Sequence, residues 1–481
     1  MTTPPRPASR PDRVSLLRYL RLFRRDILSA QPERLYRARM AEFRTPFFRS
    51  FLVNQPDLVR LVLNERPLDF PKSSRISEGL RPLLGDSVFL TNGAQWQRQR
   101  RIIDPAFEGG RLRESFPAML EAGRAAVARL HDAPGRFEAE AFASHVAADV
   151  IFRTLFSIPI THQIAARVFV SFRAYQCLQP ILNLAAFIPL PRWVPRLHRP
   201  GVRRRAREIR ALIEALTAER MQAIAAGEAP DDLATKIMTR ADPETGTRFD
   251  TAEMVDQVAI FFLAGHETSA SALAWALYLL AAFPEAQERV AEEAFSIPEN
   301  PDFTDISSLS FTRSVFRETL RLYPPVPMLV RQATKCEHFR DRQVPPGSQI
   351  VISPWHMHRH RRMWEHPDEF DPDRFATGNG RACLREAYLP FSSGPRACPG
   401  AGFAMLEGPL LLALLLRAFR FRPLAGREPV PEAHLTVRAR DGIWLEALPR
   451  RDPAGAKAGN PANPAGAVAG PGRGGAQAPH A

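Results

Sequence analysis

The stretch that decides the fold is FSSGPRACPG, residues 391–400, which leads directly into a long apolar helical pattern. Cys398 stands just before the predicted start of that helix. The free N–H groups and the dipole of a first helical turn stabilise a negatively charged sulfur, the form in which cysteine binds a metal. Gly394 permits a turn closed to residues that carry a β-carbon, and Gly400 lets the backbone approach a flat ligand closely.

Two interpretations of this cysteine are open. A free cysteine is most often a small buried hydrophobic residue. Arg396 favours a ligand site instead, because its planar guanidinium suits a carboxylate. Together Phe391, Gly394, Arg396, Cys398 and Gly400 resemble the cysteine-ligand loop of the cytochromes P450, the haem-thiolate monooxygenases. The resemblance implies that Cys398 is the axial ligand of a haem b iron and that Arg396 binds a haem propionate.

Length, composition and charge narrow the class of protein. The chain has 481 residues, of which 45% are hydrophobic, enough for a large core. Its net charge is +14, but the arginines are spread along the chain among acidic residues, with no reader motif for nucleic acid. We therefore expect no nucleic-acid partner. The four cysteines form no CxxC pair, which favours a reduced, cytoplasmic setting.

The two ends of the chain differ from its centre. Residues 1–12 are rich in Pro and Arg and residues 451–481 in Pro, Gly and Ala, so both are predicted to be disordered. A single catalytic domain is expected over residues 13–450. Residues 13–30 alternate Leu pairs with arginines, as in a basic amphipathic helix, and no apolar stretch reaches the roughly 18 residues of a membrane span. That helix either lies on an anionic membrane surface or is a solvated face.

A basic helix is predicted near the front of the domain. Residues 71–92 lack regular periodicity and are predicted to form a long loop, whereas residues 92–107 form a helix. Trp96 and Arg100 lie four positions apart on one face of that helix. Taken alone, they fit a core tryptophan beside a solvated basic side equally well. By resemblance they hold a haem propionate, although Gln99 stands where the family often has a further contact, a histidine.

The stretch AGHETS, residues 264–269, lies inside a long apolar segment that should be a central buried helix. Glycine in a helix interior costs about 1 kcal/mol against alanine, and an unpaired acid in an apolar core costs more. The stretch resembles the oxygen-activating helix of the family. The resemblance implies that Gly265, after Ala264, opens a groove above the iron. It also implies that Thr268 hydrogen-bonds the oxygen species at the iron and that Glu267 relays protons from solvent.

Glu318 and Arg321 share one face of a further predicted helix. Alone they would be an ordinary surface pair. They match the family's Glu-x-x-Arg helix, which implies that both are buried and locked to Arg374 in the segment EFDPDRF, residues 369–375. In this reading the three residues support the haem pocket and take no part in catalysis.

Several other positions are assigned by resemblance. Arg331 and His358 match propionate-binding residues, and the predicted substrate pocket contains four apolar residues, Phe261, Val326, Met328 and Leu329. The proline-broken apolar segment 182–197 is predicted to admit lipophilic substrates. A peripheral membrane contact would use this segment together with the basic N-terminal helix.

Six motifs in family order over residues 90–405 imply a mostly α-helical P450 fold with a small β region. The haem is expected between the long central helix and the Cys398 loop. The implied activity is reductive activation of O₂ and insertion of one oxygen atom into a lipophilic small molecule, such as a fatty acid, terpenoid or steroid.

The chain carries no flavin or iron–sulfur signature, so a separate ferredoxin and its reductase are expected to deliver electrons from NAD(P)H, to a monomeric enzyme. Two alternatives stay open: a haem-thiolate isomerase or peroxygenase, and a haem-binding sensor without turnover. The sequence does not identify the substrate or the position oxidised.

Overall fold

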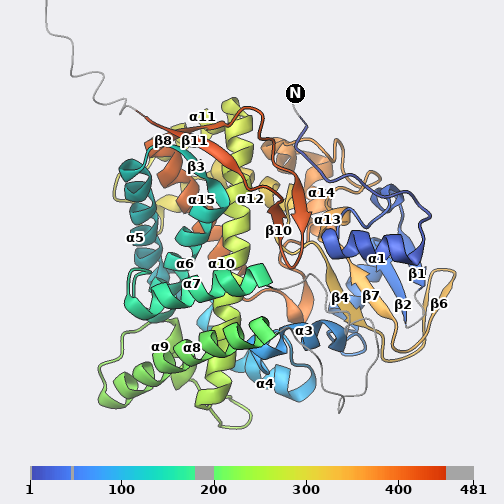
Figure 1. Ribbon diagram of the computed structural model, residues 1–481, viewed down its shortest axis with the longest axis horizontal. Coiled ribbons are helices and arrows are strands. Elements are labelled where there is room, and N and C mark those ends of the chain that lie inside the picture. Colours follow the sequence, from blue (N-terminus) through green and yellow to red (C-terminus); the bar gives the residue numbers. More distant parts are fainter. Residues whose placement is uncertain (1–2, 45–47, 179–199, 451–481) are drawn as a thin grey trace, which may run out of the picture.

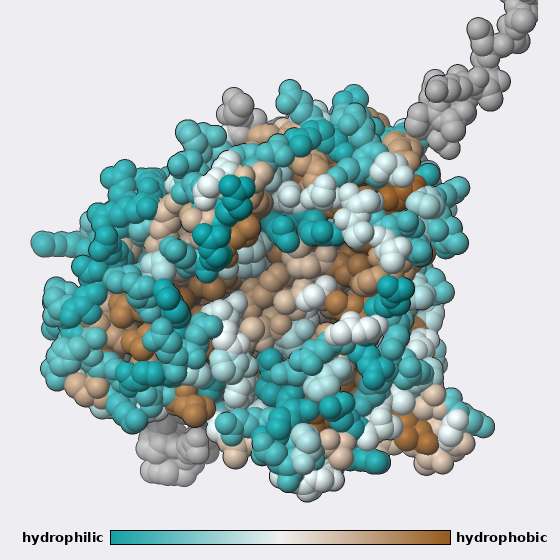
Figure 2. Space-filling model, turned by 180° about the vertical axis from the view of Figure 1, so that it is seen from behind, coloured by the Kyte–Doolittle hydropathy of each residue, from teal (hydrophilic) through white to brown (hydrophobic). Residues whose placement is uncertain are grey.

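The computed structural model describes residues 3–44, 48–178 and 200–450. Helices occupy most of one half of the molecule and a four-stranded sheet lies in the other (Figure 1). The mostly helical fold with small sheets confirms the predicted fold class. Seen from behind, the surface is largely hydrophilic and has a central hollow with apolar walls (Figure 2).

Among the described residues, the α-helices longer than four residues are α1 (Leu16–Arg25), α2 (Pro56–Arg60), α3 (Ser74–Leu84), α4 (Gly93–Ile103), α5 (Arg111–Asp132), α6 (Ala139–Phe156), α7 (Gln163–Leu178), α8 (Pro200–Ala226), α9 (Leu233–Thr239), α10 (Thr251–Ala282), α11 (Pro284–Ser296), α12 (Ser310–Leu322), α14 (Gly378–Glu386) and α15 (Ala401–Ala418). One short helix, α13, covers Pro354–Met357. The strands are β1 (Met40–Arg44), β2 (Arg49–Val53), β3 (Gly135–Glu138), β4 (Leu329–Gln332), β5 (Glu337–Phe339), β6 (Arg342–Val344), β7 (Gln349–Ile352), β8 (Phe419–Pro423), β9 (Pro431–Ala433), β10 (Val437–Ala439) and β11 (Trp444–Pro449).

Helix α10 is the central element of the helical half, where it runs through the length of the molecule (Figure 1). Its 32 residues begin at a capping box formed by Asp250 and Glu253, and at 1.5 Å per residue it is about 48 Å long. Nearly every side chain from Ala270 to Ala281 is buried, on all sides of the helix. A helix apolar around its whole circumference has to lie in the middle of a core. Helices α6, α8, α12 and α15 pack around it.

Two small sheets connect distant parts of the chain. The four-stranded sheet has the order β1-β2-β7-β4. Strand β2 pairs in parallel with β7, whereas β1 is antiparallel to β2 and β4 is antiparallel to β7. This pairing joins the N-terminal region to the chain that follows α12. Near the end of the described chain, β11 pairs with both β3 and β8, and β9 and β10 form a separate antiparallel pair.

Two expectations about the N-terminal region are wrong. Residues 71–92 contain α3, which begins at a Ser73 cap and buries Leu83 and Leu84. Residues 3–12 are ordered by contacts with distant segments: the buried Arg10 donates from Nε to the Ala30 carbonyl at 2.6 Å, and the Tyr323 hydroxyl donates to the Pro5 carbonyl at 2.9 Å. Two further predictions fall outside the described residues: substrate entry at residues 182–197 and disorder at residues 451–481.

By length and composition alone, α15 and, in the bent pair, α10 with α11 resemble membrane spans. Within the fold, however, 61% of the α15 window is buried against other elements. Its apolar surface is accounted for by the core, which it shares with α5, α11 and α12.

The carboxylate of Glu318, on α12, binds two arginines in the interior. Arg321 donates from Nε and Nη2 to the two carboxylate oxygens, each at 2.8 Å, and Arg374 donates from Nε to Oε1 at 2.9 Å. The Asp371 N–H also donates to Oε1 at 3.0 Å. Glu318 and Arg321 are fully buried and Arg374 nearly so. The remaining arginine N–H groups bind carbonyls of the chain between His358 and Glu369.

Replacement of Glu318 tests this network. Glu318→Ala leaves two buried guanidinium groups without their anion, which should lower the free energy of unfolding by about 3–5 kcal/mol. Asp373→Ala is the matched control, because Asp373 pairs with Arg289 at 2.7 Å at an exposed site on the same segment, and an exposed pair contributes about 1 kcal/mol or less. Urea unfolding would measure both; equal losses would contradict a supporting role for the network.

Candidate functional site

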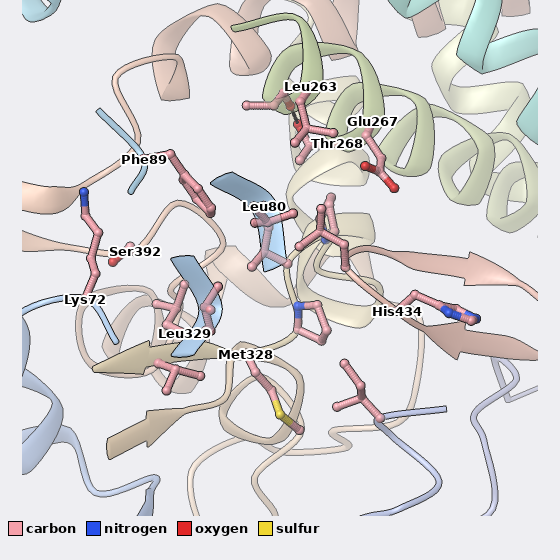
Figure 3. A pocket seen from close by; sticks show the side chains of 18 of the residues that line it. Lys72, Leu80, Phe89, Leu263, Glu267, Thr268, Met328, Leu329, Ser392 and His434 are labelled. Carbon is pink, nitrogen blue, oxygen red and sulfur yellow. Dashed lines mark hydrogen bonds between the residues drawn. The ribbon is translucent and has the colours of Figure 1, made fainter. Parts of the chain in front are cut away.

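A cavity of about 1510 Å³ lies between α10 and the cysteine loop. Leu263 and Thr268 of α10 form one side, and Met328 and Leu329 lie across from them (Figure 3). The cavity collects almost all of the predicted site residues: Ala264, Gly265, Glu267, Thr268, Trp96, Arg100, Arg331, Phe391, Arg396, Cys398, Gly400, Phe261, Val326, Met328 and Leu329. Of the residues predicted to hold haem, Gly394 and His358 do not line it, and neither does the supporting set of Glu318, Arg321 and Arg374.

Cys398 is held by its own loop with its sulfur facing the cavity. Its N–H donates to the Phe391 carbonyl at 2.9 Å, and the first turn of α15 begins three residues later. The side chain is exposed to the space inside the cavity, although protein surrounds that space. Burial raises the pKa of the Cys398 thiol, while the Gly400 N–H and the Arg100 guanidinium act in the opposite direction. An accessible sulfur close to a backbone N–H and a guanidinium suits a metal-ligating thiolate.

Gly394 fixes the turn that leads into Cys398. Its φ is +70°, and a β-carbon at this position would lie 2.1 Å from the Leu63 carbonyl oxygen. No other residue could therefore let the cysteine loop approach the turn after α2 so closely. The glycine acts through backbone packing behind the cavity, which explains why it does not line the wall.

Four cations line one edge of the cavity, and three have no carboxylate partner among the described residues. Arg100 pairs with Asp104 at 2.8 Å, whereas Lys72, Arg331 and Arg396 have only backbone or ring contacts. The Trp96 ring lies between two of them, 4.6 Å from the guanidinium carbon of Arg396 and 5.6 Å from Lys72 Nζ.

The positive side chains of this cluster repel one another, so an anion bound among them would stabilise their charged forms. Burial, with the three neighbouring arginines, lowers the pKa of Lys72 to about 6, and burial also lowers that of Arg331, to about 10. The Nε of Arg396 and the hydroxyl of Ser392 are buried without hydrogen-bond partners. Ser392 and Lys72 lie on the same side of the cavity (Figure 3). A ligand carrying two carboxylates, such as the two propionates of haem, would satisfy these groups and relieve the repulsion.

Lys72 is a residue that sequence reasoning missed. It lies just before α3, in the segment predicted to be a loop, and belongs to no motif. Its Nζ donates to the Val88 carbonyl at 2.6 Å and to the Thr91 carbonyl at 3.1 Å, which holds it at the cavity edge. Gln99, by contrast, is fully buried and bonded to Thr91 and Asp86.

His358 does not occupy the predicted propionate site. It is fully buried: its Nε2 accepts from the Leu389 N–H at 2.8 Å, and Nδ1 lies 3.2 Å from the Arg321 carbonyl. Since Nε2 accepts, Nδ1 carries the proton and donates. Burial lowers the pKa of His358 to about 3, so the ring is neutral. The histidine instead connects the end of α12 to the chain that enters the cysteine loop.

The Ala264–Ser269 segment of α10 presents its polar groups in two directions. The Thr268 hydroxyl lines the cavity and donates to the Ala264 carbonyl at 2.5 Å. Glu267 points toward the β9–β10 hairpin (Figure 3), where it accepts from Thr436 at 2.8 Å and from Arg438 at 2.9 Å. The Arg438 side chain is 41% exposed, so this contact connects the buried carboxylate to the surface.

Gly265 does not leave an open groove beside α10. A β-carbon there would lie 2.3 Å from Cδ1 of Ile151, on α6. The glycine thus lets α6 pack closely against α10, and the Ile151 side chain occupies the space that a β-carbon at this position would need. Both residues still contribute to the cavity wall.

Glu407, on α15, is a second buried carboxyl on the cavity wall that sequence reasoning did not single out. Ser269 donates to its Oε2 at 2.8 Å, while Oε1 is buried without a partner. Burial raises the pKa of Glu407 to about 7. An acid with one hydrogen bond and no cation partner keeps its proton to a higher pH than an exposed carboxyl does.

Comparison with known proteins gives the same family in a family model and in individual relatives. The family model described as Cytochrome P450 matches residues 41–445. The chain is 33% identical over 397 residues to the cyclooctat-9-en-7-ol 5-monooxygenase of Streptomyces melanosporofaciens, covering 80% of this chain and 83% of that protein. It is 31% identical over 401 residues to the cyclooctatin synthase of the same organism, covering 81% and 84%. It is also 29% identical over 426 residues to the human cytochrome P450 4F2, covering 82% and 80%.

Lys72→Met tests the anion site. It removes one of the four cations and keeps the length of the side chain. Because a hydrogen bond to a charged group contributes about 1.5–3 kcal/mol, we expect haem to dissociate about 10- to 100-fold faster, measured by transfer to excess apomyoglobin. Lys335→Met is the control, since this lysine is 69% exposed and pairs with Asp69. Equal dissociation rates in the two variants would contradict the assignment.

Glu407→Gln should change the pH dependence of stability. In the folded chain the carboxyl keeps its proton up to about pH 7, whereas its ordinary pKa is 4.5. Between these values the folded state binds more protons, so the wild type loses stability as the pH rises, by up to about 1.4 kcal/mol per unit. The advantage of the variant in free energy of unfolding should therefore grow across this range in urea titrations. A difference in free energy of unfolding between the two proteins that stays constant with pH would contradict the raised pKa of Glu407.

Proposed function

This chain belongs to the cytochrome P450 family and is a haem-thiolate monooxygenase, and we propose that Cys398 is the axial ligand of its iron. The observation that carries the proposal is the arrangement of one cavity. A cysteine sulfur faces it from the start of α15, the Ala264–Thr268 turn forms another wall, and four cations line its edge. When bound, the haem supplies the reductive activation of O₂, and thiolate donation favours O–O cleavage.

Thr268 and Glu267 are proposed to move protons. The Thr268 hydroxyl lies at the cavity surface and is bonded only to the Ala264 carbonyl, so its oxygen can still accept a proton or a hydrogen bond from the cavity side. Glu267 reaches the surface through Arg438, whose guanidinium is partly in solvent. Glu267 would therefore take up protons near the surface, and Thr268, the next residue along α10, would deliver them on the cavity side.

The proposed substrate is a lipophilic small molecule, such as a terpenoid, steroid or fatty acid. Apolar residues from four parts of the chain line the cavity beyond the cation edge: Leu80, Phe261, Leu263, Val326, Met328 and Leu329. A wall of this kind binds mainly by burial of apolar surface. The relative named for cyclooctat-9-en-7-ol, a lipophilic alcohol by its name, is compatible with that class.

Electrons are proposed to come from a ferredoxin and its reductase, in the cytoplasm. The net charge of +14 would steer an acidic partner to the enzyme, with an association rate that falls as salt is added. A peripheral membrane contact through α1 is also proposed. Leu17 is 82% exposed on this helix, beside the exposed Arg18 and Arg21, which suits an anionic bilayer.

Thr268→Ala tests the function together with the proton path. We expect the wild type to form product with ferredoxin, reductase, NADPH and a panel of lipophiles. The variant should still consume NADPH, but its product per NADPH should fall by about 10-fold or more. Ser271→Ala is the control on the same helix, because this hydroxyl donates to the Val437 carbonyl at 2.6 Å, away from the cavity.

Three outcomes would contradict this function. Turnover with hydrogen peroxide alone, and none with the ferredoxin system, would indicate a peroxygenase. Neither product nor NADPH consumption with any lipophile would indicate a sensor. A Cys398→Ser variant that kept the thiolate-type spectrum of the reduced carbon monoxide complex would refute the assignment of the ligand.

A further inference from the structure

The part of the cavity wall that α7 contributes includes a polar side chain with an unpaired hydrogen-bonding atom. Gln176 lines the cavity from α7, and its amide nitrogen is buried without a hydrogen-bond partner. Helices α7 and α8 pack side by side, and α8 packs on α10 (Figure 1). The wall around this position is otherwise mainly apolar, with Leu155, Val202 and Leu233 in one continuous hydrophobic cluster.

Another polar residue on the cavity wall already has a hydrogen-bond partner. The Thr154 hydroxyl, on α6, donates to the Val150 carbonyl of its own helix at 2.7 Å. It therefore places no demand on a ligand. Gln176 differs because a buried amide without a partner keeps the full cost of its lost hydration. A ligand that brought one hydrogen-bonding atom to this position would remove that cost.

The charge of the wall limits what that ligand group can be. Among the described residues, every Lys and Arg that lines the cavity lies before residue 101 or after residue 330, so none of these belongs to α6, α7, α8 or α9. A carboxylate held at Gln176 would have no cation partner among these described helices, and burial of an unpaired charge is costly. A neutral oxygen is compatible with the site. Because a glutamine amide both donates and accepts, a hydroxyl and a carbonyl fit equally well.

We propose that Gln176 determines specificity by binding the single hydroxyl or carbonyl oxygen of an otherwise apolar substrate. The proposal rests on the monooxygenase function given above and narrows its substrate class to lipophilic alcohols and ketones. Hydrocarbons leave the amide unsatisfied, and fatty acids would have to place their carboxylate elsewhere. The oxygen held by Gln176 orients the apolar skeleton, so that a carbon distant from that oxygen meets the reactive centre.

The test compares ligands that differ only in the oxygen. The haem-loaded full chain is titrated with 5α-androstane, 5α-androstan-3-ol and 5α-androstan-3-one, and with abietadiene and abietadienol. Binding is followed by the spin-state change of the haem. In the wild type we expect the alcohols and the ketone to bind about tenfold more tightly than the matching hydrocarbons, a ratio typical of one satisfied buried group.

Gln176→Met supplies the decisive variant, because methionine keeps the length of the side chain and removes both polar atoms. The preference for the oxygenated ligand should fall to about onefold, while the affinity for the hydrocarbon stays equal or improves. Thr154→Val is the matched control and should keep the wild-type preference, since its hydroxyl already has a partner within α6.

The outcomes separate this inference from the function on which it rests. Equal wild-type affinities within each pair, or a preference that survives Gln176→Met, would overturn the role of Gln176 and leave the monooxygenase intact; the second result would indicate that another group binds the ligand oxygen. A holoprotein without the thiolate-type carbon monoxide spectrum would overturn the proposed ligand assignment itself.

Discussion

The buried carboxylate of Glu318 is the interaction on which the rest of the site depends. One charged group receives four hydrogen bonds, from two arginines and a backbone N–H. Each arginine then binds carbonyls of the chain between His358 and Glu369. A paired and fully hydrogen-bonded ion network of this kind tolerates few alternative geometries, since any displacement strands a charge in the interior. The chain that leads into the cysteine loop is thereby fixed relative to α12.

The cavity next to this network contains positively charged side chains that no carboxylate of the described residues neutralises. Lys72, Arg331 and Arg396 lack carboxylate partners among the described residues, and burial weakens the charged state of the first two. On another part of the wall, the Cys398 thiolate needs a cationic centre. A haem brings an iron for the sulfur and two carboxylates for the cations. Its binding should therefore stabilise the fold as well as supply the chemistry, since a ligand that binds only the native state adds to its stability.

Helix α10 combines two roles that make opposite demands on its sequence. It must be apolar on all sides to lie in the core, and it must carry polar groups where it forms the cavity wall. The conflict is resolved by pairing: Thr268 binds a carbonyl of its own helix, Glu267 binds the β9–β10 hairpin, and Ser269 binds Glu407 of α15. The position of Glu267 was predictable from the motif. Its partner Arg438 was not, because it lies 171 residues away in the chain.

The sequence alone determined the fold class, the family and the residues that meet at the cavity, because each of these rests on short motifs whose spacing is local. Only the tertiary structure decided what depends on distant neighbours. Residues 3–12 are ordered by contacts with segments far along the chain, and α3 forms by burying Leu80, Leu83 and Leu84 although Pro82 lies inside the helix. His358 was assigned to the cavity by its motif, but it faces α12 instead, and Lys72 reaches the cavity without any motif. The space beside Gly265 is filled by Ile151 from another helix. In each case the physical reason is the same: burial and charge are properties of the whole set of neighbours, and a single segment of sequence does not contain them.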